Sequence, residues 1–275
     1  MIDKRYEEVI RKQNESVEVF RDTLKQIKEK YPINEVPVKF YNNELKALCC
    51  VNEVPITLVR GGTVSTGYKY AEHERVAILN FADAMKYGGW VENGAQTQEE
   101  NICRCTNLHP ILGKNECDLN YYLPNKEHVA SIGYEVYTNR IIYAEGVTVF
   151  KDDVTYANIE PRKLDVITCP APREHLKEEY ALALYKSRIE QIVLSAVENE
   201  ADCIVLGAWG CGAFMQDPKL VARAFAEVLN KYSGYFKDIV FAIKSTPTWG
   251  EDGAYEVFRK VLKKRYVAGK VVENE

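Results

Sequence analysis

The sequence predicts an α/β protein in which helices cover a mostly parallel or mixed central sheet. Short apolar runs rich in β-branched residues alternate with longer segments of helical pattern, an order typical of layered α/β domains. The apolar runs do not alternate with polar residues, so we expect strands that are buried on both faces. These runs are residues 76–81 (VAILNF), 164–169 (LDVITC), 202–208 (DCIVLGA) and 238–243 (DIVFAI).

Two helices are predicted between these strands. One long helical pattern covers residues 175–200, and another begins at Pro218. Asp217 can cap the second helix, and proline suits its first turn because φ is already fixed there. The apolar face of that helix consists of Val221, Ala222, Phe225, Val228 and Leu229. We expect this face to pack on the sheet.

The N-terminal segment predicts an amphipathic helix from about residue 4 to residue 30. Its apolar positions, at near-helical spacing, are Val9, Val17, Phe20, Leu24 and Ile27. The stretch YPINEVP (31–37) then breaks the helix with two prolines. The predicted organisation is an N-terminal helical extension over residues 1–44, packed on the core, and one domain over residues 45–275.

Composition limits the classes of partner. Of the 275 residues, 46% are hydrophobic and 28% are charged, with a net charge of -4 and a pI near 5.8. This acidic balance predicts no general affinity for nucleic acid or acidic membranes, so backbone amides or a few side chains would have to hold a polyanionic ligand. The N-terminus is too charged for a signal peptide, and no apolar run approaches the ~18–20 residues of a membrane span. We expect a cytoplasmic protein.

Eight cysteines are expected to be reduced and mostly buried. Cys103, Cys105 and His109, with Cys117 beyond, are residue types that bind metals. The single residue between the first two cysteines is a poorer spacing than the about two to four residues typical of structural zinc, and no second pair matches it. We therefore predict no metal site.

Two glycine-containing loops follow predicted strands, at the edge of the sheet where α/β proteins bind ligands. The first loop is ADAMKYGGW (82–90) and the second is WGCGAFMQDP (209–218). Gly207, Gly210 and Gly212 would allow close approach of the backbone to a ligand, and the following helix presents unpaired amides. A diphosphate site and a tight turn explain the glycines equally well. Neither loop is a P-loop or a G-x-G-x-x-G fingerprint, so ATP hydrolysis and hydride transfer have no support.

An acidic pair opens a predicted helix in QEENICRCTNL (98–108). Glu99 and Glu100 suit the positive end of the helix dipole, a contribution of ~0.3–1 kcal/mol, and taken alone the pair is better explained by this role than by catalysis. Consecutive helical residues point about 100° apart, so the two are not the opposed carboxylates of ordinary glycosidases. One could face a reacting atom while the other holds a hydroxyl. A negative neighbour also raises the pKa of a carboxyl, which helps an acid stay protonated.

Gly88-Gly89-Trp90, seven residues, and then Gln98-Glu99-Glu100 closely resemble the GGG-x(6–8)-QEE signature of bacterial-type poly(ADP-ribose) glycohydrolases, which are divergent macrodomains. The similarity extends, in the family's order, to residues 79–84, 141–153, 166–172 and 205–214. It covers roughly residues 45–260 and most of the N-terminal helix. The resemblance implies a macrodomain-like three-layer α/β/α sandwich with a mixed central sheet.

The resemblance also implies roles for individual residues. ADP-ribose, free or in poly(ADP-ribose) on modified macromolecules, would lie with its diphosphate between the two loops and its distal ribose beside the glutamates. Glu100 matches the catalytic acid/base and Glu99 the residue that holds ribose hydroxyls. The implied ligand-binding residues are Asn80, Asp83, Gly88, Gly89, Trp90, Gln98, Gly210, Cys211, Gly212, Ala213 and Phe214. No cofactor, metal, membrane or sequence-specific nucleic acid is implied, and a monomer is expected.

This sequence departs from the family at three places. Trp90 replaces the third glycine, Asp83 stands where the family usually has asparagine, and Met215-Gln216 replaces a Gly-Asn pair. One hypothesis is an ADP-ribosyl glycohydrolase that uses the retained glutamates. The alternative is a non-catalytic protein that binds ADP-ribose or a related nucleotide signal, motivated by the three departures. A third possibility is a nucleotide-sugar or cyclic-nucleotide hydrolase that uses the same site.

Overall fold

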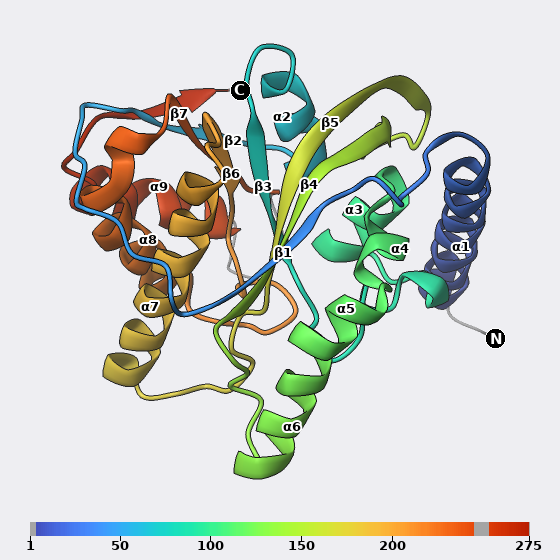
Figure 1. Ribbon diagram of the computed structural model, residues 1–275, viewed down its shortest axis with the longest axis horizontal. Coiled ribbons are helices and arrows are strands. Elements are labelled where there is room, and N and C mark those ends of the chain that lie inside the picture. Colours follow the sequence, from blue (N-terminus) through green and yellow to red (C-terminus); the bar gives the residue numbers. More distant parts are fainter. Residues whose placement is uncertain (1–3, 245–252, 275) are drawn as a thin grey trace.

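A computed structural model describes residues 4–244 and 253–274 of the chain. Within these residues eight strands form one mixed sheet in the order β1-β4-β5-β3-β6-β7-β2-β8. Helices α7, α8 and α9 lie on one side of the sheet, and α2, α3 and α4 lie on the other (Figure 1). The predicted three-layer α/β/α sandwich is confirmed.

The elements have the following bounds. The strands are β1 (Val38–Asn42), β2 (Ile56–Val59), β3 (Val76–Phe81), β4 (Arg140–Lys151), β5 (Asn158–Cys169), β6 (Cys203–Leu206), β7 (Asp238–Ala242) and β8 (Val271–Asn274). The helices are α1 (Lys4–Lys30), α2 (Thr63–Tyr70), α3 (Gln98–Cys105), α4 (Leu108–Leu112), α5 (Asn115–Cys117), α6 (Leu123–Ile132), α7 (Glu178–Glu198), α8 (Pro218–Tyr232) and α9 (Gly253–Arg265). Short turns of helix are η1 (Val91–Asn93), η2 (Asp118–Tyr122) and η3 (Ser233–Tyr235).

The polarity of the strands brings the loops together. β1, β4 and β5 pair antiparallel. From β5 through β3 and β6 to β7 the neighbours are parallel. Parallel neighbours end at the same edge of a sheet. The segments that follow β3, β5 and β6 therefore start side by side, and two of them are the predicted glycine loops.

The local predictions are largely confirmed. β3 and β7 form as expected, and the Asp217 side chain caps α8 by accepting a hydrogen bond from the Lys219 amide. All five residues of the predicted α8 face are buried. β5 is longer than the predicted 164–169, because its first half pairs with β4 in a more exposed hairpin that lacks the apolar pattern. The N-terminal segment contributes more than a helix, since residues 38–42 form the edge strand β1.

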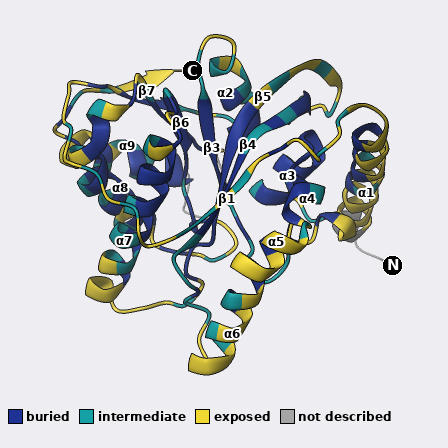
Figure 2. Ribbon diagram, in the orientation of Figure 1, coloured by how far each residue is buried: buried dark blue, intermediate teal, exposed yellow. Residues whose placement is uncertain are grey.

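The predicted apolar stripe of α1 is only partly buried. Phe20 and Ile27 are buried and Val17 is half-buried, but Val9 and Leu24 are exposed, so their predicted burial was wrong. Figure 2 shows the outer surface of α1 as exposed and the centre of the sheet as buried. No helix among the described residues is long and apolar enough to cross a membrane.

The difference arises because polar side chains make much of the contact between α1 and the core. The fully buried Thr23 hydroxyl donates to the Arg104 carbonyl at 2.6 Å. It also accepts a hydrogen bond at 2.9 Å from Lys151 Nζ, itself buried. Asp22 completes the charge pair with Lys151 at 2.7 Å. The packing thus depends on partners far away in sequence, which a local apolar pattern does not reveal.

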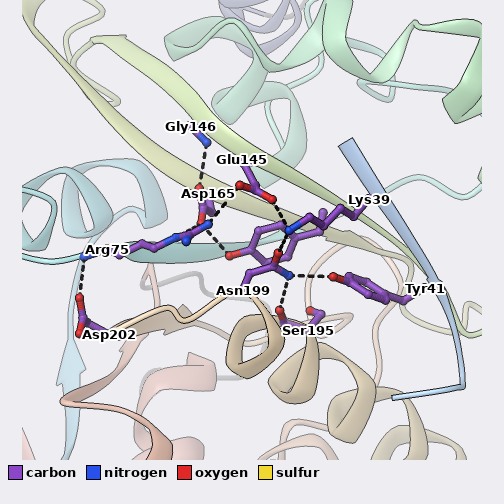
Figure 3. A network of polar contacts seen from close by, with 10 residues as sticks. Lys39, Tyr41, Arg75, Glu145, Gly146, Asp165, Ser195, Asn199 and Asp202 are labelled. Atoms are coloured by element: carbon purple, nitrogen blue, oxygen red, sulfur yellow. Dashed lines mark hydrogen bonds and ion pairs between the residues drawn. The ribbon is translucent and has the colours of Figure 1, made fainter. Parts of the chain in front are cut away.

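A network of polar side chains links adjacent strands of the sheet near the start of β3, at the edge opposite the glycine loops (Figure 3). Arg75, just before β3, donates through Nε to Asp165 of β5 at 2.9 Å. The Tyr143 hydroxyl of β4 donates to the same carboxylate oxygen at 2.7 Å. Glu145 pairs with both Arg75 and Lys39 of β1. Four adjacent strands are therefore joined by charged hydrogen bonds at this edge.

Candidate active site

The first turn of helix α3 lies next to the end of β3, and a capping motif in its own sequence sets the residue at which the helix begins. Thr97 is the N-cap and forms a capping box with Glu100. In this motif the threonine side chain accepts from the Glu100 amide, while the Glu100 carboxylate accepts from the Thr97 amide at 3.0 Å. The side chains of the first turn consequently project toward β3 and the loop after it.

Gln98 attaches this first turn to β3. Its Oε1 accepts from the Phe81 amide at 2.8 Å, and its Nε2 donates to the Leu79 carbonyl at 2.7 Å. Nε2 also donates to the Thr63 hydroxyl at 3.1 Å. The side chain thus satisfies backbone groups of β3 as a neighbouring strand would, and both of its amide hydrogens are used.

Glu99 is buried at the end of β3. Oε2 accepts from the Asp83 amide at 2.7 Å, and Oε1 accepts from Asn80 Nδ2 at 3.2 Å. Burial raises the pKa of Glu99 well above its ordinary value; the two hydrogen bonds oppose this, and the charges of Asp83 and Glu100 add to it. Glu99 therefore favours its protonated form more than an exposed glutamate does.

Glu100 is also buried, with 4% of its surface exposed. Oε1 accepts from the Trp90 amide at 3.0 Å. Oε2 accepts from both the amide and the hydroxyl of Thr97. A carboxylate oxygen can accept two hydrogen bonds. With the described residues as partners, Oε2 is therefore filled, whereas Oε1 keeps one acceptor position.

Gly88 and Gly89 cover these side chains, and both need to be glycine. Their φ angles are +67° and +58°, a region that side chains disfavour. A Cβ at Gly89 would lie 2.4 Å from Glu100 Oε1 and 3.3 Å from Glu99 Oε2, so both carboxylates reach the same point of backbone. A Cβ at Gly88 would lie 2.5 Å from His109. The loop can therefore run directly over the acidic pair only without side chains.

Trp90 and Asp83 fit the first loop. The φ of Trp90 is -109°, which any residue adopts, so the third position has no need for glycine. The Trp90 side chain is 58% exposed. Asp83 Oδ1 accepts from the amides of Met85 and Lys86 at 2.7 and 3.1 Å. The Asp83 carboxylate thus caps the turn that begins the loop.

The second loop is anchored by Trp209. Its indole is fully buried, donates to the Cys169 carbonyl at 3.2 Å and packs edge-on against Tyr185. Gly210 has a φ of +80°, and a Cβ there would lie 2.6 Å from the Tyr185 hydroxyl. Cys211 is buried as well. The first half of this loop is therefore held by its contacts with Cys169 and Tyr185.

The second half of the loop is exposed to solvent. Gly212 and Ala213 are exposed, and a Cβ on Gly212 would meet nothing within 4 Å. Its turn is closed by the Met215 amide, which donates to the Gly212 carbonyl at 3.0 Å. The amides of Gly212, Ala213 and Phe214 donate to no acceptor within residues 4–244 and 253–274. They are free to bind an anion.

The two loops start beside each other. The Ala82 amide and the Trp209 indole both donate to the Cys169 carbonyl, so the ends of β3, β5 and β6 meet there. A Cβ at Gly207 would lie 2.9 Å from the Phe81 ring. The first-loop candidates, from Asn80 to Trp90, contact α3 directly, and Gly210 to Phe214 lie on the neighbouring loop.

Sequence reasoning included Asn80 at this edge but missed three buried tyrosines. Asn80 Oδ1 and the hydroxyls of Tyr121, Tyr122 and Tyr185 are buried without hydrogen-bond partners among the described atoms. Burial raises the pKa of both Tyr121 and Tyr122, and the Glu99 charge adds to the effect. No spacing motif connects the three tyrosines, so the sequence offers no signal for them.

His109 packs between helix α1 and the first loop. Its ring lies 4.9 Å from Phe20 of α1 and 5.0 Å from Tyr87 of the loop. Burial lowers its pKa from 6.5 to about 4, and Nε2 has no partner among the described atoms. Gln96 adds a second link to α1 by donating to the Ser16 hydroxyl at 3.1 Å. The N-terminal helix therefore holds the segment between β3 and α3 at two places, through His109 at Tyr87 and directly at Gln96.

The cysteines near His109 contact other groups. Cys105 Sγ donates to the Asp152 carbonyl, and Cys117 Sγ donates to the Ile111 carbonyl at 3.4 Å. Among residues 4–244 and 253–274, no three His, Cys, Asp or Glu side chains are grouped so that they could hold a metal ion. These contacts are those of buried thiols packed in a core.

Comparisons with known proteins identify a matching family and similar solved structures. The family model "Microbial-type PARG, catalytic domain" matches residues 8–152, slightly more than half of the chain. The crystal structure of poly(ADP-ribose) glycohydrolase from Thermomonospora curvata, bound to the inhibitor ADP-HPD, is 23% identical with a TM-score of 0.76. That match covers 90% of this chain and 99% of the other.

A second structural match is the poly(ADP-ribose) glycohydrolase from Deinococcus radiodurans in complex with ADP-ribose. It is 27% identical, has a TM-score of 0.73 and covers 84% of this chain and 95% of the other. A search of curated protein sequences finds no match to this chain.

Proposed function

The chain belongs to the microbial-type poly(ADP-ribose) glycohydrolase catalytic-domain family, and we propose that it is an ADP-ribosyl glycohydrolase. It cleaves the O-glycosidic bond at the distal ribose of poly- or mono-ADP-ribose. The observation that carries this proposal is the buried pair of Glu99 and Glu100, held at the end of β3 against Gly89. A pair that served only the helix dipole would have no reason to be buried under a loop that excludes side chains.

Backbone amides hold the diphosphate in this proposal. The free amides of Gly212, Ala213 and Phe214 are suitable donors, and the first loop passes close to the acids through Gly88 and Gly89. Such amides bind phosphate without lysine, which fits a chain with a net charge of -4. The relative solved with ADP-ribose supports this ligand.

Glu100 exchanges the proton in this mechanism. Its Oε1 is the oxygen that keeps an acceptor position, while Oε2 is tied to Thr97. Protonated Oε1 gives its proton to the departing oxygen as C1″ gains oxocarbenium character. The resulting carboxylate then takes a proton from the attacking water. General acid–base catalysis of this kind contributes about 10²–10⁴-fold.

Glu99 and Asn80 hold the distal ribose. Asn80 Oδ1 is buried without a partner among the described atoms and can accept a hydrogen bond from a ribose hydroxyl. Burial raises the pKa of Glu99, so it can keep its own proton and still bind a hydroxyl. Gln98 was expected to bind ligand; because its amide is committed to β3 and Thr63, we propose a positioning role instead.

The departures from the family pattern favour the enzyme over the binding protein. Trp90 sits at an ordinary φ, and its amide still holds Glu100. Asp83 caps its own turn, and its amide still holds Glu99. Met215 takes a φ of +53°, a strained value for a side chain, at the far end of the second loop. None of the three removes a contact of the acidic pair.

The test is the release of ADP-ribose from an ADP-ribosylated substrate by the wild type, Glu100→Gln and Glu99→Gln. We expect Glu100→Gln to lose about 10²–10⁴-fold in kcat while calorimetry shows retained ADP-ribose binding. A substrate with an activated phenol leaving group, which needs no protonation, should restore much of its bond-cleavage rate. A wild type that binds ADP-ribose without releasing it would support the binding protein instead.

Two further proposals concern the cellular compartment and the oligomeric state. The eight cysteines are all free, and six of them are buried, which is consistent with a reducing compartment such as the cytoplasm. We also propose that the chain acts as a monomer, since the acidic pair is held within one chain. Light scattering at working concentration tests the monomer, and localisation of a tagged chain in its host cell tests the compartment.

A further inference from the structure

Trp90 is a large apolar side chain exposed beside the proposed proton donor. Its amide donates to Glu100 Oε1 at 3.0 Å, yet 58% of the residue is exposed. Its backbone needs no special conformation, so neither the turn nor the core accounts for an indole here. An exposed indole beside a candidate active site offers an apolar face that a ligand can cover.

The local contacts hold the indole in place without covering it. Lys86 Nζ lies over the ring at 4.7 Å from its centre, and Glu92 holds the same ammonium at 3.3 Å. Tyr87, which follows Lys86 in the loop, is also exposed, at 38%. The indole stacks on no other aromatic ring among the described residues. A flat ligand can therefore lie against it.

We propose that Trp90 forms a subsite for the leaving group and stacks on its nucleobase. This inference rests on the proposed function. In poly(ADP-ribose) the oxygen that departs from C1″ belongs to the adenosine ribose of the neighbouring unit, so an adenine follows within one sugar of the atom that Glu100 protonates. When ADP-ribose is attached singly to a protein, no aromatic ring follows that oxygen.

The position of Trp90 matches this geometry. A residue whose amide holds Oε1 lies on the side of Glu100 where the proton is transferred, not on the side of Thr97. Indole is also the side chain with the largest face for stacking on a base, and stacking is tolerant of sequence. Lys86 adds a positive charge near the path of an anionic chain. The chain therefore selects a polymeric substrate through its leaving group.

The experiment compares two substrates and two kinds of readout. Steady-state kinetics are measured on an ADP-ribose oligomer and on a peptide that carries one O-linked ADP-ribose. In the Glu100→Gln background, calorimetry measures binding of the oligomer and of free ADP-ribose. The variants are Trp90→Ala, Trp90→Phe and, as a control, Val154→Ala, which removes an exposed apolar side chain from the β4–β5 hairpin.

For Trp90→Ala we expect the ratio of kcat/KM on the oligomer to that on the peptide to fall by about five- to a hundredfold, the range for loss of one base stack. The ratio of oligomer to ADP-ribose affinity should fall by a similar factor. Trp90→Phe should keep most of both ratios, and Val154→Ala should keep both fully.

The result that overturns the inference is an unchanged pair of ratios, or equal losses on both substrates, which would mean that Trp90 acts only through the loop. A failure of the proposed function looks different. In that case the wild type releases ADP-ribose from neither substrate, while the binding ratios of the Glu100→Gln series still report on stacking. If the peptide is not cleaved, the same binding ratios decide.

Discussion

Gln98, Glu99 and Glu100 are adjacent in sequence but contact three different structures. Gln98 binds the end of β3, Glu99 binds the start of the first loop, and Glu100 binds that loop at Trp90. This division follows from the rotation of about 100° between consecutive helical residues. One helical turn therefore anchors the strand, fixes the loop and leaves one carboxylate oxygen for chemistry.

At the residue scale, Glu99→Gln should stabilise the fold at alkaline pH. Burial raises the pKa of Glu99, so the folded state holds its proton more tightly than the unfolded chain does, and stability falls as the pH rises from the ordinary value of 4.5 toward the folded pKa. Glutamine removes that dependence, and Asn80 can rotate its amide to present Oδ1 to the new amide hydrogens.

Urea denaturation at pH 5 and at pH 8 measures this effect. The midpoint of Glu99→Gln should exceed that of the wild type by more at pH 8 than at pH 5. Glu92→Gln is the control, because Glu92 is an exposed carboxylate on the same segment. An equal shift at both pH values would mean that Glu99 is charged in the folded protein throughout.

Gly89→Ala should inactivate the protein at modest cost to stability. Its Cβ would meet Glu100 Oε1 at 2.4 Å, and its φ is positive. Relief requires the loop or the carboxylate to move, and such strain costs about 1–3 kcal/mol. We expect a loss of at least about tenfold in kcat, since the displaced atom is the proposed proton donor.

Gly212→Ala is the matched control in the second loop, because its Cβ meets nothing within 4 Å. Thermal melting should show a lower midpoint for Gly89→Ala only. A fully active Gly89→Ala would contradict the close approach of the first loop to Glu100.

At the scale of elements, the junction of β3 and α3 depends on the Gln98 side chain. Gln98→Glu would place an oxygen against the Leu79 carbonyl and leave that carbonyl and Thr63 without a donor. Leaving a buried group unsatisfied costs about 1–3 kcal/mol, and more when a charge is involved. We expect chemical denaturation to show a loss in this range.

Gln96→Glu is the companion variant, since Gln96 lies two residues earlier and its amide reaches the more exposed side of α1. It should cost less than Gln98→Glu. Equal stability of Gln98→Glu and the wild type would show that the junction is held by the helix backbone alone.

How far an element could be predicted depends on where its partners lie. β3, α8 and the start of α3 carry their signals locally, as apolar runs or caps, and these predictions are confirmed. The α1 stripe was partly wrong because Thr23 pairs with Lys151, 128 residues away. The same holds for the site: the glycine loops and the acidic pair have motifs, whereas His109 and Tyr122 come together only through the fold.

At the scale of the whole molecule, the two edges of the sheet differ in the kind of polar contact that they carry, although each has buried oxygens without a hydrogen-bond partner among the described atoms, such as Glu74 Oε2 and Asn80 Oδ1. The edge with Arg75 and Asp165 joins four strands by charged hydrogen bonds (Figure 3). The edge with the loops keeps unpartnered buried atoms and free amides within the described residues. Paired groups stabilise a fold, and unpaired ones cost free energy unless a ligand binds them. The stability that tolerates an open site thus comes partly from the opposite edge.

Besides Glu99, two groups on different parts of the molecule should shape the pH dependence of stability. Burial lowers the pKa of His109 from 6.5 to about 4, so its contribution is present above 6.5 and is lost as the pH falls toward 4. Burial, with the charge of Asp238, raises the pKa of Glu74 from 4.5 to about 7, so its contribution is present below 4.5 and is lost as the pH rises through 7. The two contributions change in opposite directions over the range that they share, from pH 4.5 to about 6.5, so they partly offset each other there. Relative to the wild type, His109→Leu should make the melting temperature fall more steeply as the pH rises from 4.5 to 7, and Glu74→Gln should shift its slope toward a rise between pH 4 and 6.5, as measured by thermal melting from pH 4 to pH 9. A variant that shifted the whole curve without changing its shape would show that the group it replaced does not titrate in this range.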